Sequence, residues 1–294
     1  MQKMKENPLV SVIIPAYNAE RYVELAVRSI MNQTYKNLEI LITDDCSTDR
    51  TFEILKKLAE EDSRIKLFRN DKNLGIVDSL NFMIAVSCGE YIARMDADDV
   101  SLPLRIEKQV KYMQTHKNIM ILGCNVIHID ENNKSIFKPI IPCSPIMVRN
   151  MRYFRICFYH PTVMVRAKIK NEYFYEKDFL YAEDYALWLK LLEKYRGANL
   201  RKTFLQYRIH KGQISKQKTD KQISVFLKIF KKYNFDVIND SEIELYARYI
   251  AASEVIDCKK LLKLLFSFFL KKKIFVSPLL FLTLAHKFLK AKKC

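Results

Sequence analysis

The 294-residue chain is poor in glycine. Its five glycines form neither a G-x-G-x-x-G sequence nor a Walker-type loop. Loops of those kinds hold phosphate groups through backbone N–H groups at the start of a helix. A phosphorylated ligand of this chain must therefore be held by a metal ion and basic side chains.

Cysteine pairs and long apolar runs are also missing. The seven cysteines are scattered and contain no Cys-x-x-Cys pair, which argues against a disulfide framework and a zinc site. Residues 1–8 are polar and Pro15 interrupts the next apolar run, so we expect no signal peptide. No run reaches the roughly 20 apolar residues of a transmembrane helix. These absences predict a cytoplasmic protein.

The positive charge is unevenly distributed. The net charge is +17, and residues 201–294 hold 21 Lys and Arg against 7 Asp and Glu, a net of +14. Residues 1–200 account for the remaining +3. The asymmetry indicates a nearly neutral body followed by a basic segment with an anionic partner.

Strand-like and helix-like patterns alternate along the body. Alternation of this kind predicts an α/β fold with a parallel sheet and right-handed crossovers. We expect Pro15 to end the first strand, and Ser47 or Thr48 to cap the second helix. The expected strands are 9–14, 38–42, 65–68, 90–95, 119–129, 160–165 and 205–210, and the expected helices are 19–33, 52–61, 75–86, 103–116 and one opened by 181–184.

Three aspartates, Asp96, Asp98 and Asp99, directly follow the fourth expected strand. In extended backbone, Asp96 and Asp98 point the same way, and their charges repel unless a cation lies between them. Oxygen ligands suit Mg²⁺, Mn²⁺ or Ca²⁺ rather than zinc. The alternative is that Asp98 or Asp99 caps the next helix.

Two more polar segments follow expected strands, at residues 15–18 and 44–45. Because parallel strands bring their carboxyl ends to one edge, these segments should meet the aspartates there, where a nucleotide would bind. The plainer alternatives are that Tyr17 belongs to the core and that Asp45 caps a helix.

Four segments in this order resemble the family 2 glycosyltransferases, which are inverting enzymes with the GT-A fold. The resemblance covers about residues 8–215 and implies a GT-A domain over residues 1–215, with a nucleotide-binding half, 8–100, and an acceptor half, 101–215. The charge and the helical pattern of residues 216–294 predict a basic helical extension. The four segments are Val10–Asn18, Thr43–Asp49, Asp96–Asp99 and Ala182–Tyr185.

The resemblance assigns roles in donor binding by position. Asp45 resembles the carboxylate that accepts the imide N–H of uracil, a group that only an acceptor can satisfy. Tyr17 resembles the ring packed on the base, and Pro15 and Asn18 belong to the same pocket.

The resemblance also implies a metal site for Mn²⁺ or Mg²⁺. Asp98 resembles the residue bound to the cation that bridges the two phosphates, with Asp96 or Asp99 supporting it. His210 resembles a histidine that approaches the metal or the diphosphate, although a lone histidine can be structural. Arg94 is expected either to reach the donor or to serve as the counter-charge of the aspartates.

The resemblance points to Asp184 as the general base, with Glu183 as the other candidate. Both carboxylates could instead complement the dipole of the helix that they open. His160 resembles an acceptor-side residue, or is part of a turn before Pro161. The segment 169–176 lacks the glycine found in relatives, so the acceptor is not identified.

The C-terminal segment contains apolar runs at 261–270 and 274–289 that are flanked by lysines. This pattern favours a helix lying in an anionic membrane interface over one packed on the body. The predicted function is transfer from a UDP-sugar to a glycan or lipid-linked acceptor in bacterial surface-polysaccharide synthesis, at the inner face of the cell membrane. Nucleotidyl transfer and nucleic-acid binding are the alternatives, and no recognition motif supports the latter.

Overall fold

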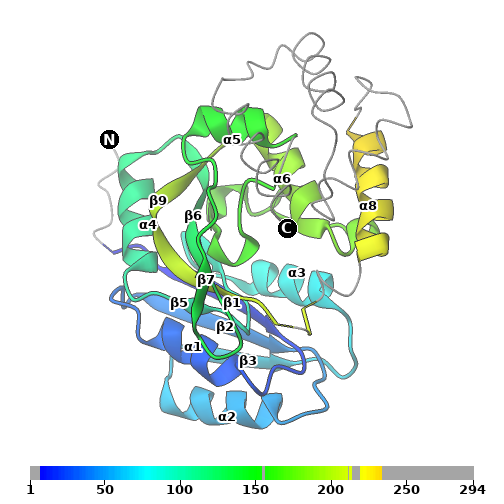
Figure 1. Cartoon of the computed structure of the whole chain (residues 1–294). Helices are drawn as coiled ribbons and strands as arrows, with labels where there is room; N and C mark the ends of the chain where they lie inside the picture. Colours follow the sequence, from blue (N-terminus) through cyan, green and yellow to red (C-terminus); the bar gives the residue numbers. More distant parts are fainter. Residues whose placement is uncertain (1–6, 154–155, 211, 214–218, 234–294) are drawn as a thin grey trace. The chain divides into compact units, whose positions relative to one another are not determined.

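The computed structural model describes residues 7–153, 156–210, 212–213 and 219–233 (Figure 1). The chain divides into two compact units. The first contains Met1–Val148, Cys157–Tyr175 and Lys190–His210, and the second contains Arg149–Ile156, Glu176–Leu189 and Lys211–Cys294.

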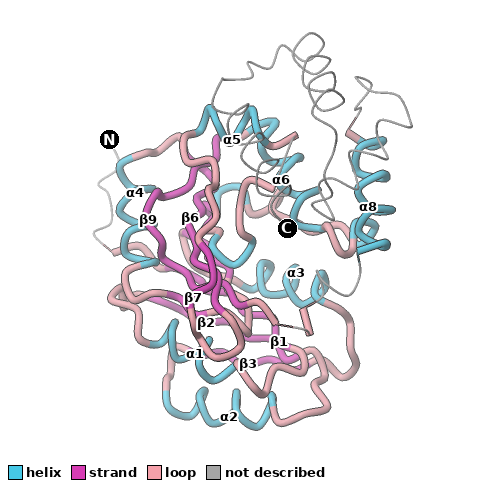
Figure 2. Tube along the Cα trace, in the orientation of Figure 1, coloured by secondary structure: helices cyan, strands magenta, loops and turns pink. Residues whose placement is uncertain are grey.

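All described strands lie in the first unit and form one nine-stranded sheet, drawn in magenta in Figure 2. Their order is β3-β2-β1-β4-β8-β6-β9-β5, and β7 pairs with β6 off this path. The strands are β1 Val10–Ala16, β2 Leu38–Asp44, β3 Ile65–Arg69, β4 Tyr91–Arg94, β5 Val100–Ser101, β6 Ile119–Ile129, β7 Ser135–Phe137, β8 Met164–Arg166 and β9 Arg196–Arg208.

The helices follow the predicted alternation through the first hundred residues. Helices α5 and α6 contribute residues to both units, and α8 belongs to the second. The helices are α1 Val23–Met31, α2 Thr51–Glu61, α3 Ile76–Val86, α4 Arg105–Thr115, α5 Pro145–Met151, α6 Glu183–Lys194 and α8 Thr219–Lys232, with 3₁₀ turns η1 His160–Thr162, η2 Ala167–Ile169 and η3 Lys177–Phe179.

The predicted α/β fold is confirmed. The four strands β3, β2, β1 and β4 are parallel, and α1, α2 and α3 connect them along the chain. The sheet becomes mixed beyond β4, because β8 runs antiparallel to both β4 and β6. The parallel part therefore brings the carboxyl ends of β1, β2 and β4 to one edge.

Several predicted boundaries were wrong. Pro15 does not end the first strand, since β1 continues to Ala16. Pro15 lies beyond Ile13, the last residue of β1 that pairs with β4. Because the pairing with β4 has already ended there, the missing N–H of Pro15 removes no hydrogen bond to β4. In the predicted strand 160–165, the expected turn at His160 and Pro161 is confirmed as a 3₁₀ turn over residues 160–162, and only the start of the strand differs, at Met164.

The predicted caps of α2 and α4 were also wrong. Ser47 and Thr48 do not cap α2; instead Asp49 Oδ1 accepts the N–H of Thr51 at 3.0 Å. Neither Asp98 nor Asp99 caps α4, because β5 intervenes and Leu104 is the N-cap residue. The acidic run is therefore not explained by helix capping.

The core positions predicted from helical periodicity are buried, with one exception. The apolar face of α1 packs under the sheet with the side chains of β1 and β2. The apolar positions of α6 are buried too. The prediction of Tyr195 as a further core residue was wrong, because Tyr195 lies beyond the end of α6 and is only half-buried. The predicted residues that are confirmed as buried are Val23, Ala26, Val27 and Ile30 of α1 and Leu187, Trp188, Leu191 and Leu192 of α6.

In the second unit, α8 packs its apolar side onto the first part of α6. Tyr185 contacts the rings of Phe226 and Phe230, and Gln222 donates to the carbonyl of Tyr181 at 3.1 Å. The predicted apolar runs at 261–270 and 274–289 lie outside the described residues, so the division at residue 215 stays a prediction. Within the described residues, no helix is long and apolar enough to cross a bilayer.

Candidate functional site

The loops that follow β1 and β2 are tied together by Asn18. Its backbone N–H donates to Ser47 Oγ at 3.0 Å, and its Oδ1 accepts the N–H of Thr48 at 2.9 Å. Asn18 has a φ of 46°, a left-handed conformation that asparagine tolerates better than most residues. The sequence predicted Asn18 to belong to a donor pocket, which stays a prediction, and the structure shows that Asn18 joins the loops that follow β1 and β2.

Asp45 lies at the carboxyl end of β2 and is only 4% exposed. Its Oδ1 accepts hydrogen bonds from Asn70 Nδ2 at 2.7 Å and from the N–H of Leu74 at 2.8 Å. Its Oδ2 accepts the N–H of Gly75, the N-cap residue of α3, at 2.8 Å. A carboxylate has about four acceptor positions, so one position remains for an N–H of a ligand. Capping of α3 and ligand recognition are thus compatible roles of one side chain.

We expect Asp45→Ala to lower the free energy of unfolding by about 2–4 kcal/mol. The reason is that three partly buried donors, each bonded to the charged and buried carboxylate of Asp45, lose their acceptor. Urea denaturation of Asp45→Ala measures the effect. The control is Asp71→Ala, at an exposed residue of the loop after β3 that supplies the donors Asn70 and Leu74. Equal stability of the two variants would contradict the bracing role.

Tyr17 follows β1 and is 49% exposed, so the alternative that it is a core residue was wrong. Pro15 is half-buried at the end of the same strand. The exposed ring of Tyr17, at the edge of the sheet where polar side chains gather, is suited to stacking on a planar ligand.

Asp96, Asp98 and Asp99 form an acidic triad. One ligand atom from each lies within 4.8 Å of the others. Burial and the neighbouring Asp98 raise the pKa of Asp96, and burial with both neighbours raises the pKa of Asp99 well above its ordinary value. Carboxylates held this close repel one another, so a cation between them would be stabilised.

Surrounding residues hold each aspartate in place. The buried Arg94 forms an ion pair with Asp96, which confirms the counter-charge alternative for Arg94. His210 Nε2 lies 2.9 Å from Asp98 Oδ2, so the structure places His210 beside the triad.

Arg208 was missed as a site residue, although it stands in the same short segment as His210. Its backbone N–H donates to Asp99 Oδ1 at 2.7 Å, and its Nε donates to the carbonyl of Asp98 at 2.7 Å. Its guanidinium also lies over the ring of Tyr22. The signal available in the sequence was the position of Arg208 two residues before His210, on the same side of an extended strand.

The triad fits a divalent cation. Asp99 Oδ2 is buried and accepts no hydrogen bond from the described residues. This oxygen therefore has a lone pair available for a cation. Three carboxylates are ligands that suit Mn²⁺ or Mg²⁺, whereas structural zinc sites are built from Cys and His side chains.

Glu183 and Asp184 begin α6 in the second unit, and the triad belongs to the first. Asp184 Oδ1 accepts the N–H of Tyr185 at 2.7 Å. The structure therefore confirms that these carboxylates open a helix, and their catalytic role stays a prediction.

His160 lies in the first unit, inside a polar cluster that includes Tyr175 and Tyr173. Its Nε2 is 2.6 Å from Tyr175 Oη, which is 3.1 Å from Tyr173 Oη. Burial and the nearby Arg94 hold the pKa of His160 well below its ordinary value, so this imidazole is neutral. The acceptor-side role expected for His160 stays a prediction.

Comparison with known proteins gives consistent matches. A family described as Glycosyl transferase family 2 matches residues 11–174. An uncharacterized glycosyltransferase of Haemophilus influenzae is 38% identical over 222 residues, covering 72% of this chain and 69% of the relative. An Escherichia coli protein named UDP-Glc:alpha-D-GlcNAc-diphosphoundecaprenol beta-1,3-glucosyltransferase WfaP is 34% identical, covering 71% of this chain and 81% of the relative.

The fold is also similar to solved structures. The structure of TarS 1-349 from S. aureus in complex with UDP-GlcNAc matches with a TM-score of 0.64 at 19% identity. The match covers 88% of this chain and 79% of that one, and it shows a shared fold.

Proposed function

The chain belongs to glycosyltransferase family 2 and has the GT-A fold, and we propose that it transfers a sugar from a UDP-sugar to an acceptor hydroxyl with inversion at the anomeric carbon. The observation that carries this proposal is the edge where β1, β2 and β4 end. These neighbouring strands are followed, respectively, by the exposed ring of Tyr17, by the buried carboxylate of Asp45 with one open acceptor position, and by the acidic triad.

In the proposed donor complex, Tyr17 stacks on the uracil ring and Asp45 accepts its imide N–H. Asn18 keeps the loop of Tyr17 in register with the loop of Asp45. Asp98, supported by Asp96 or Asp99 and by His210, would hold a divalent cation, Mn²⁺ or Mg²⁺. When bound, such a cation stabilises the negative charge of the departing nucleoside diphosphate.

Asp184 is proposed as the general base, ahead of Glu183. Its carboxylate would take the proton of the acceptor hydroxyl as that oxygen attacks the anomeric carbon opposite the leaving group. One displacement of this kind inverts the anomeric configuration. The support is the position of Asp184 in the fourth segment that resembles the family.

We further propose a role in surface-polysaccharide synthesis with a glycan or lipid-linked acceptor. The support is the name of the E. coli relative, which specifies a UDP-glucose donor and a diphosphoundecaprenol-linked acceptor. An acceptor of that chemistry would place the enzyme at the inner face of the cell membrane.

A screen of nucleotide sugars tests the proposed function. Incubation with Mn²⁺, a glycan acceptor and each donor in turn should release UDP from one UDP-sugar as the new glycosidic bond forms, and NMR of the glycoside should show the inverted anomeric configuration. Release of pyrophosphate would indicate nucleotidyl transfer instead, and retention of configuration would contradict single displacement.

A further inference from the structure

A group of exposed apolar side chains lies between β6 and α5, in a part of the first unit that the donor site does not use. Ile140 and Ile146 are 67% and 73% exposed, and Ile136 and Phe137 of β7 are also exposed. Four basic side chains are exposed as well: Lys134 and Lys138 beside β7, and Arg201 and Lys202 in β9. We call these eight residues the β7–α5 patch. Several large apolar side chains exposed beside basic ones in one stretch of the chain are typical of an interaction site.

The patch lies in chain segments without acidic residues. Residues 132–171 contain eight Lys and Arg and no Asp or Glu, and residues 194–210 contain no acidic residue either. These acid-free segments precede the predicted basic helical extension, residues 216–294. Their charge is complementary to an anionic surface.

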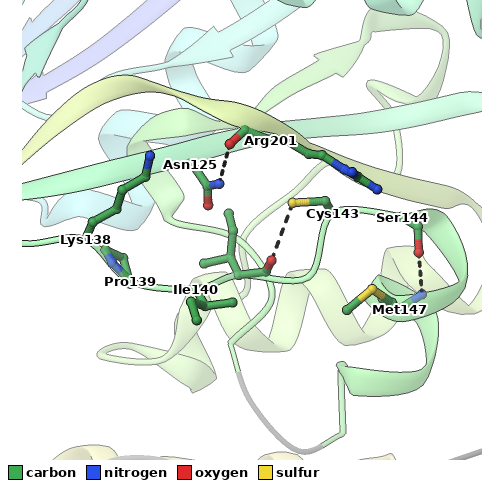
Figure 3. Close-up of a pocket in the computed structure, with 9 residues that line it drawn as sticks. Asn125, Lys138, Pro139, Ile140, Cys143, Ser144, Met147 and Arg201 are labelled. Carbon is green, nitrogen blue, oxygen red and sulfur yellow. Dashed lines mark hydrogen bonds between the residues drawn. The ribbon is translucent and has the colours of Figure 1, made fainter. Parts of the chain in front are cut away.

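A pocket of about 450 Å³ opens within the patch (Figure 3). Lys138 and Arg201 line it together with Ser144, and no acidic residue is among its lining residues. Asn125 Nδ2 donates to the carbonyl of Arg201 at 2.6 Å and so fixes this part of β9 to β6. The pocket thus combines cationic and hydroxyl donors with the apolar side chains of Ile140, Ile141 and Met147.

The β7–α5 patch begins close to the acidic triad. Phe137 of β7 pairs with His128 of β6, which pairs with Tyr207 of β9. The next residue, Arg208, donates its backbone N–H to Asp99. Two strand spacings separate β7 from β9, a distance of about 10 Å.

We propose that the β7–α5 patch docks the enzyme on an anionic phospholipid bilayer. Ile136, Ile140 and Ile146 enter the interface, while Lys138 and Arg201 contact the lipid phosphates at the pocket. Aliphatic side chains beside lysines are the pattern of interfacial attachment. The proposal rests on the proposed function, because docking here would present the donor site to a lipid-linked acceptor.

Charge argues against the other occupants of the patch. Residues 234–294 carry 11 Lys and Arg against 6 Asp and Glu, so that segment, like a second copy of the chain, has the same sign of charge as the patch. A nucleic acid matches the charge but leaves the exposed isoleucines without a partner. An anionic bilayer matches both properties.

Co-sedimentation of the full chain with vesicles tests the docking. The vesicles contain phosphatidylcholine with about one third phosphatidylglycerol, and the comparison uses phosphatidylcholine alone. The variants are Ile140→Ser with Ile146→Ser, and Lys138→Glu with Arg201→Glu. The matched control is Leu25→Ser with Lys57→Glu, at exposed positions of α1 and α2.

We expect the wild-type chain and the control to bind anionic vesicles, and each patch variant to bind about fivefold more weakly or worse. Binding of the patch variants equal to wild type would overturn the proposal and would place membrane contact elsewhere in the chain. Full displacement by RNA or by free inorganic phosphate, with no preference for vesicles, would also overturn it.

Transfer to a short soluble acceptor without vesicles separates this proposal from the proposed function. The patch variants should retain wild-type kcat in that assay. If wild type transfers sugar but the patch has no effect on vesicle binding, only the docking proposal fails. If no UDP-sugar supports transfer while the vesicle results are as expected, only the proposed function fails.

Discussion

Asp98→Asn is expected to reduce kcat/KM for sugar transfer by about 100-fold or more. The substitution keeps the size of the side chain but removes the charge on which the proposed cation site depends, next to His210. Stabilisation of the leaving diphosphate by a metal is worth several kcal/mol, and each 1.4 kcal/mol is about tenfold in rate. Initial rates of UDP release, measured over a range of Mn²⁺ concentrations, quantify the loss.

Thermal unfolding provides the control for this variant. Because Asp98→Asn removes one of three mutually repelling carboxylates, the metal-free protein should be at least as stable as wild type. Glu60→Gln, at an exposed position of α2, should leave the rate unchanged. Near-normal transfer by a folded Asp98→Asn protein would contradict the assigned metal ligand.

Asp184→Asn is expected to lower kcat by about 10²–10⁴-fold, the usual contribution of a positioned general base. An amide cannot accept the proton of the acceptor hydroxyl, whereas the residues of the first unit that are proposed to bind the donor are unchanged. The measured signature is therefore a loss in kcat with an unchanged dissociation constant for UDP. Steady-state kinetics and a UDP titration on the same preparation provide both values.

Glu183→Gln is the matched comparison, since it lies one residue away on the first turn of α6. The account predicts a much smaller loss for Glu183→Gln than for Asp184→Asn. The reverse order would move the base to Glu183. Equal, small effects would show that both carboxylates serve only the start of the helix.

Local sequence patterns were sufficient to predict the sheet edge at which the proposed donor site lies. The runs that became β1, β2 and β4 are β-branched or otherwise apolar, and a polar segment follows each one. In a parallel sheet this order alone brings Tyr17, Asp45 and Asp98 to one edge.

The interactions that complete the site were less predictable, because they join residues distant in sequence. Asp45 is bonded to Asn70 and Gly75, 25 and 30 residues away, and Arg208 reaches Asp99 across 109 residues. No periodicity indicates such contacts. The failed cap at Ser47 has the same cause, since its hydroxyl accepts the N–H of Asn18 in another loop.

Binding of UDP measured by titration calorimetry, with and without Mn²⁺, tests the central claim most directly. The account predicts that Mn²⁺ strengthens UDP binding to the wild-type chain by about tenfold or more, and that Asp98→Asn abolishes this gain. Equal UDP affinity with and without Mn²⁺ in the wild-type chain would contradict the claim that the acidic triad holds the cation that holds the diphosphate.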